Sequence, residues 1–541
     1  MKYTDVKYIA FEGGGGKGIV YLGAVRALEA GGKLPLSKAM RDLPTSNILD
    51  GIAGASAGAI TAYFLALGMS AEDVAARAKD FGKFYDDPQP ALYKGVSYNA
   101  AADANLPVLV VDRIQPEYET RDLGGNSESV ATSISAIQTG KIYTDANVAA
   151  AAAKKLYAFY RFVYPFDFVK LLLRVIGGRK KLKKFGGDNQ LVKKMTESFS
   201  GFLQYMYSIL FDRGALSGMA IRTYLQELTV KQLEENFGVV VSPEDAQRLT
   251  FAEFYAHTRN DLRIAGSNVT KGIPVYFSRY LTPDFPVIEA ICMSMSIPFA
   301  FKPTLSLAWA DKTKPFAGEH NDRYVGFFND GGMLNNLPIH AFDFGPDDDN
   351  FRRKIVELDD GIFGIRCTGG NPTDAEEDPK FPHDANYLRY LDSKNEGVPE
   401  KDKLTPDKVP VQALKTPFTI EMTQGPFTPV AEFAGNVLNA LMYYQEDGQI
   451  RSEDEFKQTM ELFSYDVKLF DFTIFEGLSS FVQGRAAIKV GAMLNIPQSD
   501  ITDLVLQYYY SDVEDPRGIV QYIDAAYRRA QEFKRRYQIS E

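Results

Sequence analysis

The pattern of hydrophobic and polar positions predicts two strand-turn-helix units at the start of the chain. Short apolar runs at residues 6–11 and 48–53 each lead through a glycine-rich turn into apolar residues at helical spacing, over residues 19–30 and 59–67. Glycines end both helical segments. Because the unit of strand, tight turn and helix occurs twice in succession, we expect a parallel sheet covered by helices.

Further segments carry patterns typical of single elements. Ser70 followed by Asp73 is typical of the first turn of a capped helix. Later apolar runs predict a helix at residues 216–228 and strands at residues 262–265, 275–278 and 324–328. A sheet that resumes so far along the chain implies that the residues in between form an insertion.

The character of the remaining segments predicts how the chain is divided. The residues between the two sheet-forming parts contain an irregular stretch, an alanine run and a basic, aromatic segment, and a later stretch is polar and rich in Pro and Asp. We therefore predict a core of residues 1–85 and 209–365, an inserted helical and basic segment at 86–208, a polar surface excursion at 366–429 and a helical C-terminal part at 430–541 that completes the core.

Composition and charge exclude several classes of protein. The 541 residues are 45% hydrophobic and 24% charged, which is typical of a globular protein. Sixty basic against seventy acidic residues give a net charge of −10, so we do not expect a protein built throughout to bind nucleic acid. Cys292 and Cys367 are too few and too far apart for a disulfide framework or a thiolate zinc site. Without a signal peptide or an apolar run of about eighteen residues, we expect a cytoplasmic protein with at most peripheral membrane contact.

The first motif with chemical meaning is the pentapeptide of residues 54–58, which has the pattern G-x-S-x-G. A serine between a strand and a helix lies on a sharp turn, where the N-terminal N–H groups of the helix point at its hydroxyl. Gly54 and Gly58 suit this turn because a Cβ atom at either position would collide with the neighbouring strand or helix. Ser56 is therefore a candidate nucleophile, and the alternative is an ordinary small-residue turn.

The second motif is the glycine-rich loop of residues 13–18. It satisfies G-x-G-x-x-G, but the acidic residue expected about twenty positions later in a dinucleotide-binding unit is not convincingly present. A phosphate loop is excluded because Gly18, rather than Ser or Thr, follows Lys17. The remaining chemical role is a set of backbone N–H groups that stabilise an oxyanion, with Lys17 adding positive charge nearby.

The third motif is Asp330-Gly331-Gly332, which follows an apolar strand. An Asp-Gly pair alone is common in turns. At the C-terminal end of a strand in a parallel sheet, however, it would bring the Asp330 carboxylate to the edge where Ser56 and the glycine loop lie.

These three motifs, in this order, resemble the patatin-like phospholipase family closely. The loop at 13–18 matches its oxyanion loop, residues 54–58 match its nucleophile elbow, and residues 330–332 followed by 335–338 match its catalytic Asp motif. The resemblance implies a three-layer α/β/α fold with a mainly parallel central sheet, here with a helical insertion and a helical C-terminal part.

The resemblance extends to a block at residues 290–303, which contains Ser294, Ser296, Pro298 and Phe301. It covers residues 5–85 and 209–365 well, and residues 470–484 look like a degraded version of the family's closing strand and helix. Two features depart from the family pattern, namely Glu12 before the glycine loop and the long insertion.

The resemblance implies a serine-aspartate dyad that needs no metal and no cofactor. Ser56 would attack an ester carbonyl, Asp330 would take the hydroxyl proton, and the N–H groups of Gly13, Gly14 and Gly15 would form the oxyanion hole. Gly18, Gly331 and Gly332 would support the loops that carry these groups. The alternative base is a histidine, and the chain offers four of them, His257, His320, His340 and His383. None follows a recognisable strand end, so we expect the dyad.

The inserted segment contains a basic and aromatic cluster. Its ten basic residues stand against a single acid, Asp167, and the aromatic and aliphatic residues between them have roughly helical spacing. This composition is typical of a segment that lies on an anionic lipid surface, whereas the alternative is a helical lid packed on the core. We do not expect nucleic acid as a partner of an acidic chain. The candidate membrane-contact residues are Lys154, Lys155, Arg161, Lys170, Arg174, Arg179, Lys180, Lys181, Lys183 and Lys184.

The function that this resemblance implies is a lipid acyl hydrolase of the phospholipase A type. It would cleave fatty-acyl esters of phospholipids or related lipids through an acyl-serine intermediate. Two alternatives stay open: a lipid transacylase, and a membrane-recruited binding or regulatory protein with a vestigial site. A protein activator is conceivable, but the sequence contains no specific partner motif.

Overall fold

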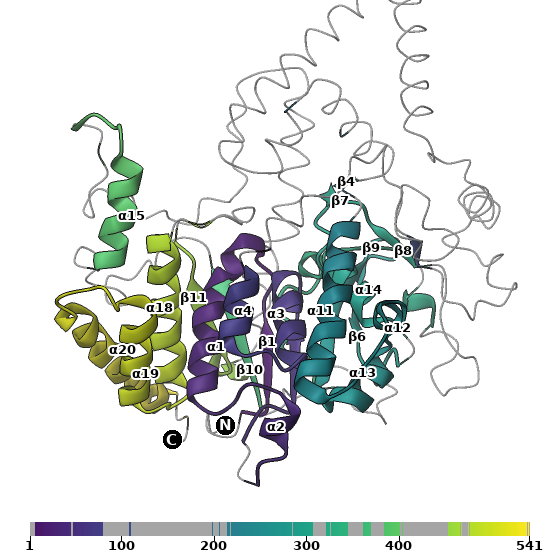
Figure 1. Ribbon diagram of the computed structural model, residues 1–541, viewed down its shortest axis with the longest axis horizontal. Coiled ribbons are helices and arrows are strands. Elements are labelled where there is room, and N and C mark those ends of the chain that lie inside the picture. Colours follow the sequence, from purple (N-terminus) through teal and green to yellow (C-terminus); the bar gives the residue numbers. More distant parts are fainter. Residues whose placement is uncertain are drawn as a thin grey trace, which may run out of the picture.

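The computed structural model describes the sheet-forming parts of the chain and the C-terminal helices (Figure 1). The candidate membrane-contact residues at 154–184 lie outside the described residues. Those described are 6–44, 47–78, 80, 108–109, 197, 205, 214–216, 218–283, 285–306, 321–324, 326–343, 361–368, 384–400, 403, 453–465, 467, 474, 476–537 and 539.

A mixed, mostly parallel sheet forms the centre of the molecule. Its five strands from β11 to β5 are parallel, whereas β9 is antiparallel to both β5 and β8, and β6 forms a hairpin with β5. The strands in spatial order are β11 (Thr459–Phe463), β10 (Ile362–Thr368), β1 (Tyr8–Phe11), β2 (Gly51–Gly54), β5 (Asp261–Asn268), β9 (Gly326–Asn329), β8 (Thr304–Ser306) and β3 (Val108–Leu109), with β6 (Ile273–Phe277) beside β5. A separate pair consists of β4 (Gly214–Leu216) and β7 (Phe299–Phe301).

Helices alternate with these strands along the chain, so the predicted α/β class is confirmed. The α-helices are α1 (Val20–Ala30), α2 (Lys38–Arg41), α3 (Ala57–Ala66), α4 (Ala71–Ala78), α11 (Met219–Phe237), α12 (Pro243–Arg248), α13 (Phe251–Thr258), α14 (Val287–Ser294), α15 (Ala385–Asn395), α17 (Glu453–Lys457), α18 (Glu476–Met493), α19 (Gln498–Tyr509) and α20 (Arg517–Arg536). Short 3-10 turns are η2 (Gly15–Ile19), η4 (Asn321–Tyr324) and η5 (Gly331–Met333).

Two hydrophobic cores cover the two faces of the sheet. Ile9 and Phe11 of β1 point into the larger core beneath the helices, and Ala10 between them points to the opposite face. Figure 1 shows α18, α1, α3 and α11 side by side over the first face. The second face is covered by the segment that follows η5, through Leu337 and Ile339. Burial of central strands on both faces explains why they are apolar without alternation.

The first strand-turn-helix units form as their patterns predict. Strand β1 lies within the first apolar run, β2 begins within the second and extends one residue beyond it to Gly54, and α1 and α3 follow them. The predicted helix cap is also present, because the Asp73 N–H donates to the Ser70 Oγ at 3.1 Å and the Ser70 N–H donates to the Asp73 carboxylate at 3.1 Å.

Other boundaries differ from the sequence prediction. Leu216 belongs to β4, and α11 begins at Met219, because the three residues from Gly214 pair with β7 before the helix starts. Within the expected polar excursion, β10 extends to Thr368 and α15 packs on α18, where the ring of Tyr387 lies 5.1 Å from that of Phe481. Apolar residues at helical spacing on one side of α15 explain this packing in an otherwise polar stretch.

Candidate active site

Ser56 occupies a strained turn between β2 and α3. Its backbone angles, φ 50° and ψ −120°, are rarely adopted by residues other than glycine. The flanking glycines leave room for this turn, because a Cβ atom on Gly54 would lie 2.1 Å from the Gly58 carbonyl oxygen and one on Gly58 would lie 2.3 Å from that of Phe11. The residues of this turn therefore have the geometry of a nucleophile elbow.

The Ser56 hydroxyl is hydrogen-bonded to Asp330. Its Oγ donates to the Asp330 Oδ2 at 2.6 Å, and the second carboxylate oxygen accepts the Gly332 N–H at 2.8 Å. Only 6% of Ser56 and 5% of Asp330 are exposed to solvent. A buried carboxylate in direct contact with a buried hydroxyl can act as a proton acceptor without an intervening group.

Asp330 reaches the sheet edge by a route that differs from the sequence prediction. Strand β9 was expected to be parallel to its neighbours, and it is antiparallel to β5. β5 continues past Ile264, where its pairing with β2 ends, and β9 pairs with this extension through Ser267 and Asn329. The C-terminal end of β9 therefore lies next to the extended part of β5, beyond the point where β5 pairs with β2. This position places Asp330 beside Ser56.

Burial shifts the proton affinity of Asp330. Loss of solvation raises the pKa of its carboxyl to about 7, although the hydrogen bonds from Ser56 and the Gly332 N–H favour the charged form and act in the opposite direction. A carboxyl with a pKa near neutrality can both take up and release a proton at physiological pH.

The glycine loop lies directly against Ser56. A Cβ atom on Gly13 would lie 3.0 Å from the Ser56 Cβ, and one on Gly14 would lie 2.1 Å from the Cys367 Sγ, so neither position tolerates a side chain. The Gly13 N–H donates to the Asn336 carbonyl at 3.0 Å. In this conformation the Gly13 N–H is therefore engaged with Asn336, whereas Gly14 and Gly15 stay the candidate oxyanion donors.

Glu12 ties the glycine loop to the strands beside it. The side chain is 1% exposed, accepts a hydrogen bond from the Cys367 N–H at 2.9 Å and another from the Asn336 side-chain amide at 3.1 Å. Its other neighbour is Arg366, whose Nε lies 3.5 Å away. Burial raises the pKa of Glu12, and the charges of Arg366 and Lys17 oppose that shift. Lys17, which is itself buried in η2, therefore acts on Glu12 electrostatically.

The block at residues 290–303 supports the dyad from the other side. Ser294, at the end of α14, accepts the Ser56 N–H on its Oγ at 2.9 Å. The Ser296 carbonyl accepts the Asp330 N–H at 2.9 Å. One short segment thus fixes the backbone of both Ser56 and Asp330.

The residues matched by a known family include Ser56, Asp330, the glycine loop and the block at residues 290–303. The family model described as patatin-like phospholipase matches residues 9–343, which is more than half of the chain. The chain belongs to the patatin-like phospholipase family. Membership of this family implies lipid acyl hydrolase activity.

Two further comparisons add little to the family match. The solved structure of VipD from Legionella pneumophila is similar to this patatin-like chain with a TM-score of 0.29 and 16% sequence identity, over 95% of this chain and 80% of that one. A TM-score of this size supports no argument of its own. Among curated proteins, none matches the chain in sequence.

Neither described histidine of this patatin-like chain contacts the dyad. His340 uses both ring nitrogens elsewhere, with Nδ1 2.6 Å from the Asp343 carboxylate and Nε2 2.9 Å from that of Glu455. Burial lowers the pKa of His340, but these two carboxylates outweigh burial and raise it. His257 lies in the last turn of α13, and positions 320 and 383 lie outside the described residues.

The described part of the chain contains no group of three or more His, Cys, Asp and Glu side chains arranged to hold a metal ion.

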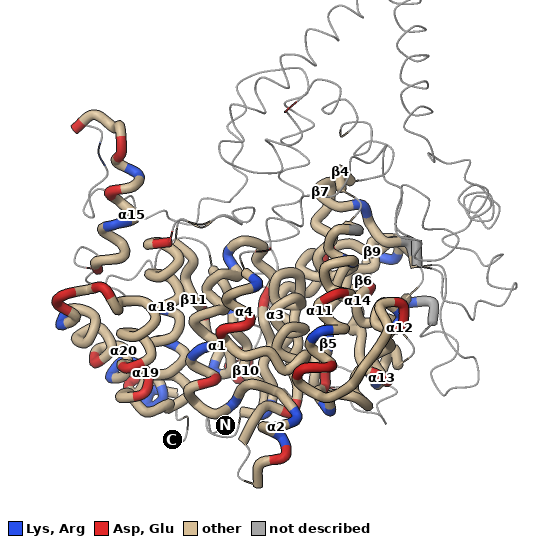
Figure 2. The backbone as a smooth tube through the Cα atoms, in the orientation of Figure 1, with Lys and Arg blue, Asp and Glu red and all other residues tan. Residues whose placement is uncertain are grey.

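None of the helices in the described residues is long and apolar enough to cross a bilayer. Figure 2 shows acidic and basic positions close together along the outer helices, α20 among them.

Proposed function

We propose that this patatin-like chain cleaves fatty-acyl esters of lipids with a Ser56–Asp330 dyad, as a phospholipase of the A type. The observation that carries the proposal is the 2.6 Å hydrogen bond from the Ser56 Oγ to the Asp330 Oδ2, buried and with no histidine between them. As Ser56 attacks the acyl carbonyl, the proton passes to Asp330 and the Oγ–C bond forms.

The remaining steps use the same two side chains. The tetrahedral intermediate carries its negative charge on the former carbonyl oxygen, near the N–H groups of Gly14 and Gly15 and the N-terminal end of α3. When the ester C–O bond breaks, Asp330 returns the proton to the leaving alcohol. Water then attacks the acyl-serine, gives a proton to Asp330 and releases the fatty acid, after which Ser56 regains its proton.

The lipid substrate suggests peripheral contact with a membrane. The basic cluster at residues 154–184 has the composition of a segment that binds anionic lipid, so we propose it as the contact element. Sedimentation with vesicles that contain or lack anionic phospholipid tests this. We expect binding to the anionic vesicles that weakens with added salt.

The experiment that tests the proposed activity is product analysis on a mixed panel of phospholipids and galactolipids. We expect the wild-type chain to release free fatty acid and Ser56→Ala to release none. Absence of release by the wild type, together with absence of fluorophosphonate labelling at Ser56 in the presence of lipid, would favour a vestigial site. Transfer of the acyl group to an added lysolipid, in place of its release, would favour the transacylase.

A further inference from the structure

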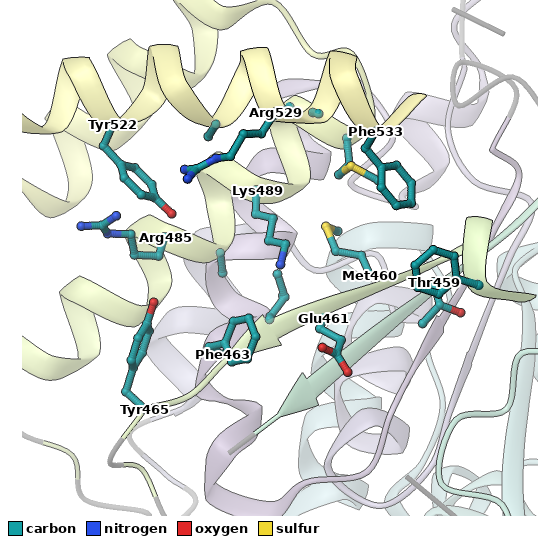
Figure 3. A pocket seen from close by; sticks show the side chains of 17 residues that line it. Thr459, Met460, Glu461, Phe463, Tyr465, Arg485, Lys489, Tyr522, Arg529 and Phe533 are labelled. Atoms are coloured by element: carbon teal, nitrogen blue, oxygen red, sulfur yellow. The ribbon is translucent and has the colours of Figure 1, made fainter. Parts of the chain in front are cut away.

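A cavity lies at the edge of the sheet formed by β11. It has a volume of about 390 Å³ and lies between β11, α18 and α20 (Figure 3). Strands β10 and β1 separate β11 from β2, whose end leads to Ser56, so this cavity is distinct from the dyad site. Its volume falls at the lower end of the range of roughly 300–1,000 Å³ that is common for small-molecule sites.

Cationic and aromatic side chains line one end of the cavity, and Phe533 and Met460 line the other, beside Thr459 and Glu461. In Figure 3 the charged groups of Arg485 and Arg529 lie near the ring of Tyr522, whereas Phe533 and Met460 lie at the opposite end. The Lys489 ammonium group lies between the two ends. A cavity with this distribution matches a molecule with a charged head and an apolar tail.

The charge of the lining favours an anion. Three cations, Arg485, Lys489 and Arg529, line the cavity together with a single acid, Glu461. That acid is engaged with Arg366, whose Nη1 lies 3.0 Å from its carboxylate. An anionic head group in the cavity therefore meets cationic and aromatic groups.

The cationic end is held in place before any ligand binds. The Arg485 side chain is only 6% exposed, its guanidinium carbon lies 3.4 Å from the centre of the Tyr522 ring, and an ion pair at 3.4 Å joins it to Asp384. Tyr510 donates to the same aspartate at 2.5 Å. A charged group fixed by stacking and ion pairing loses little conformational entropy when a ligand binds.

We propose that this cavity binds a single-chain amphiphile with an anionic head, such as a fatty acid or an alkyl phosphate. The head contacts the cationic end beside Lys489 and Arg529, and the alkyl chain lies against Met460 and Phe533. The volume suits one alkyl chain better than a two-chain phospholipid, so the cavity is not a second site for the proposed substrate.

Calorimetric titration of the full chain with monomeric dodecanoate, and separately with dodecyl phosphate, tests the proposal. We expect one equivalent of saturable binding to at least one of the two anions, and the pair distinguishes a carboxylate from a phosphate head. Dodecanol and dodecylamine should bind at least about tenfold more weakly, because they lack the anionic head. Failure of both anions to bind, or equal binding of dodecylamine, would overturn the proposal.

Variants then locate the binding. Lys489→Glu should weaken it by about tenfold or more, Lys489→Arg should restore it, and Ala526→Phe should block the cavity, whereas Lys231→Glu, on the exposed face of α11, should change nothing. Unchanged binding in both Lys489→Glu and Ala526→Phe would overturn the proposal. Ser56→Ala should bind as the wild type does, so the result is independent of the proposed catalysis. Loss of binding in Ser56→Ala would instead place the ligand in the dyad site and contradict the proposal.

Discussion

The hydroxyl oxygen of Ser294 accepts the backbone N–H of Ser56 at 2.9 Å, deep in the interior of the protein. Ser56 is held at a positive φ, and such a strained backbone persists only where surrounding contacts enforce it. The end of α14 therefore helps to keep Ser56 in the conformation that points its hydroxyl at Asp330.

Loss of this contact should affect both stability and catalysis. In Ser294→Ala the buried Ser56 N–H lacks its acceptor, which costs about 1–3 kcal/mol of unfolding free energy. We expect a lower melting temperature and a kcat reduced by roughly tenfold, with KM little changed, because the backbone turn relaxes. Ser296→Ala is the matched control, since the Ser296 hydroxyl donates to the Cys292 carbonyl and not to the turn. Wild-type kcat in Ser294→Ala would contradict this role.

The close approach of Gly14 to Cys367 predicts that a substitution at Cys367 restores the activity lost by a substitution at Gly14. Because Gly14 has an extended φ of −169°, the obstacle to a side chain there is steric, namely the Cys367 Sγ at 2.1 Å from the position of a Cβ atom. Gly14→Ala should reduce ester cleavage strongly by displacing the loop, and Cys367→Ala should leave cleavage nearly unchanged. The double variant should recover much of the lost rate, since the next atom of residue 367 lies 3.7 Å away. A double variant as inactive as Gly14→Ala would contradict the steric explanation.

The raised pKa of Asp330 predicts that its charge destabilises the fold. Its pKa is about 7 in the folded chain against 3.8 for the unperturbed carboxyl, so the folded state holds more protons than the unfolded state between these values and stability falls as pH rises through them. Asp330→Asn should therefore unfold at a higher temperature than the wild type at pH 8, by about 2–4 kcal/mol in free energy, and should lose this advantage near pH 4. Thermal unfolding followed by circular dichroism at both pH values measures the difference. A stability advantage of Asp330→Asn that grows towards low pH would contradict the raised pKa of Asp330.

The buried Glu12 carboxylate should contribute to the stability of the fold through its contact with Arg366. Glu12→Ala leaves the Arg366 guanidinium beside the loop without one of its two acidic neighbours, and we expect a loss of about 3 kcal/mol or more in unfolding free energy. Glu12→Gln keeps an acceptor for the Cys367 N–H and should lose less. If both variants lower kcat with KM unchanged, Glu12 positions the oxyanion loop, whereas wild-type kcat in soluble, folded Glu12→Ala would exclude that role.

The sequence predicts those parts of the site that depend on local pattern. The strand, turn and helix around Ser56 follow from apolar runs and glycines, because each element is determined by neighbours within a few residues. The same is true of the Asp330 motif, which hydrogen-bonds its own backbone two residues further on. Local sequence patterns therefore identify both residues of the hydrogen bond between Ser56 and Asp330.

Contacts between distant segments are not visible in such patterns. The direction of β9 depends on its pairing with the far end of β5, and nothing within its own four residues distinguishes a parallel from an antiparallel strand. The Gly13 N–H is occupied by Asn336, which lies more than 300 positions away in the chain. The departure from the family pattern at Glu12 was the one local signal of a tertiary contact, and its partners in β10 could not be inferred from it.

The central claim is that Asp330, without a histidine, takes the proton of Ser56. The most direct measurement is the rate at which a soluble activated ester acylates Ser56, followed between pH 5 and 9 in the wild type, Asp330→Asn and His340→Gln. The wild-type rate should rise with pH through a single ionisation near 7, His340→Gln should give the same profile, and Asp330→Asn should be slower by about 100-fold or more at every pH, without that ionisation. A near wild-type rate in Asp330→Asn, combined with loss of the rate in His340→Gln, would contradict the claim.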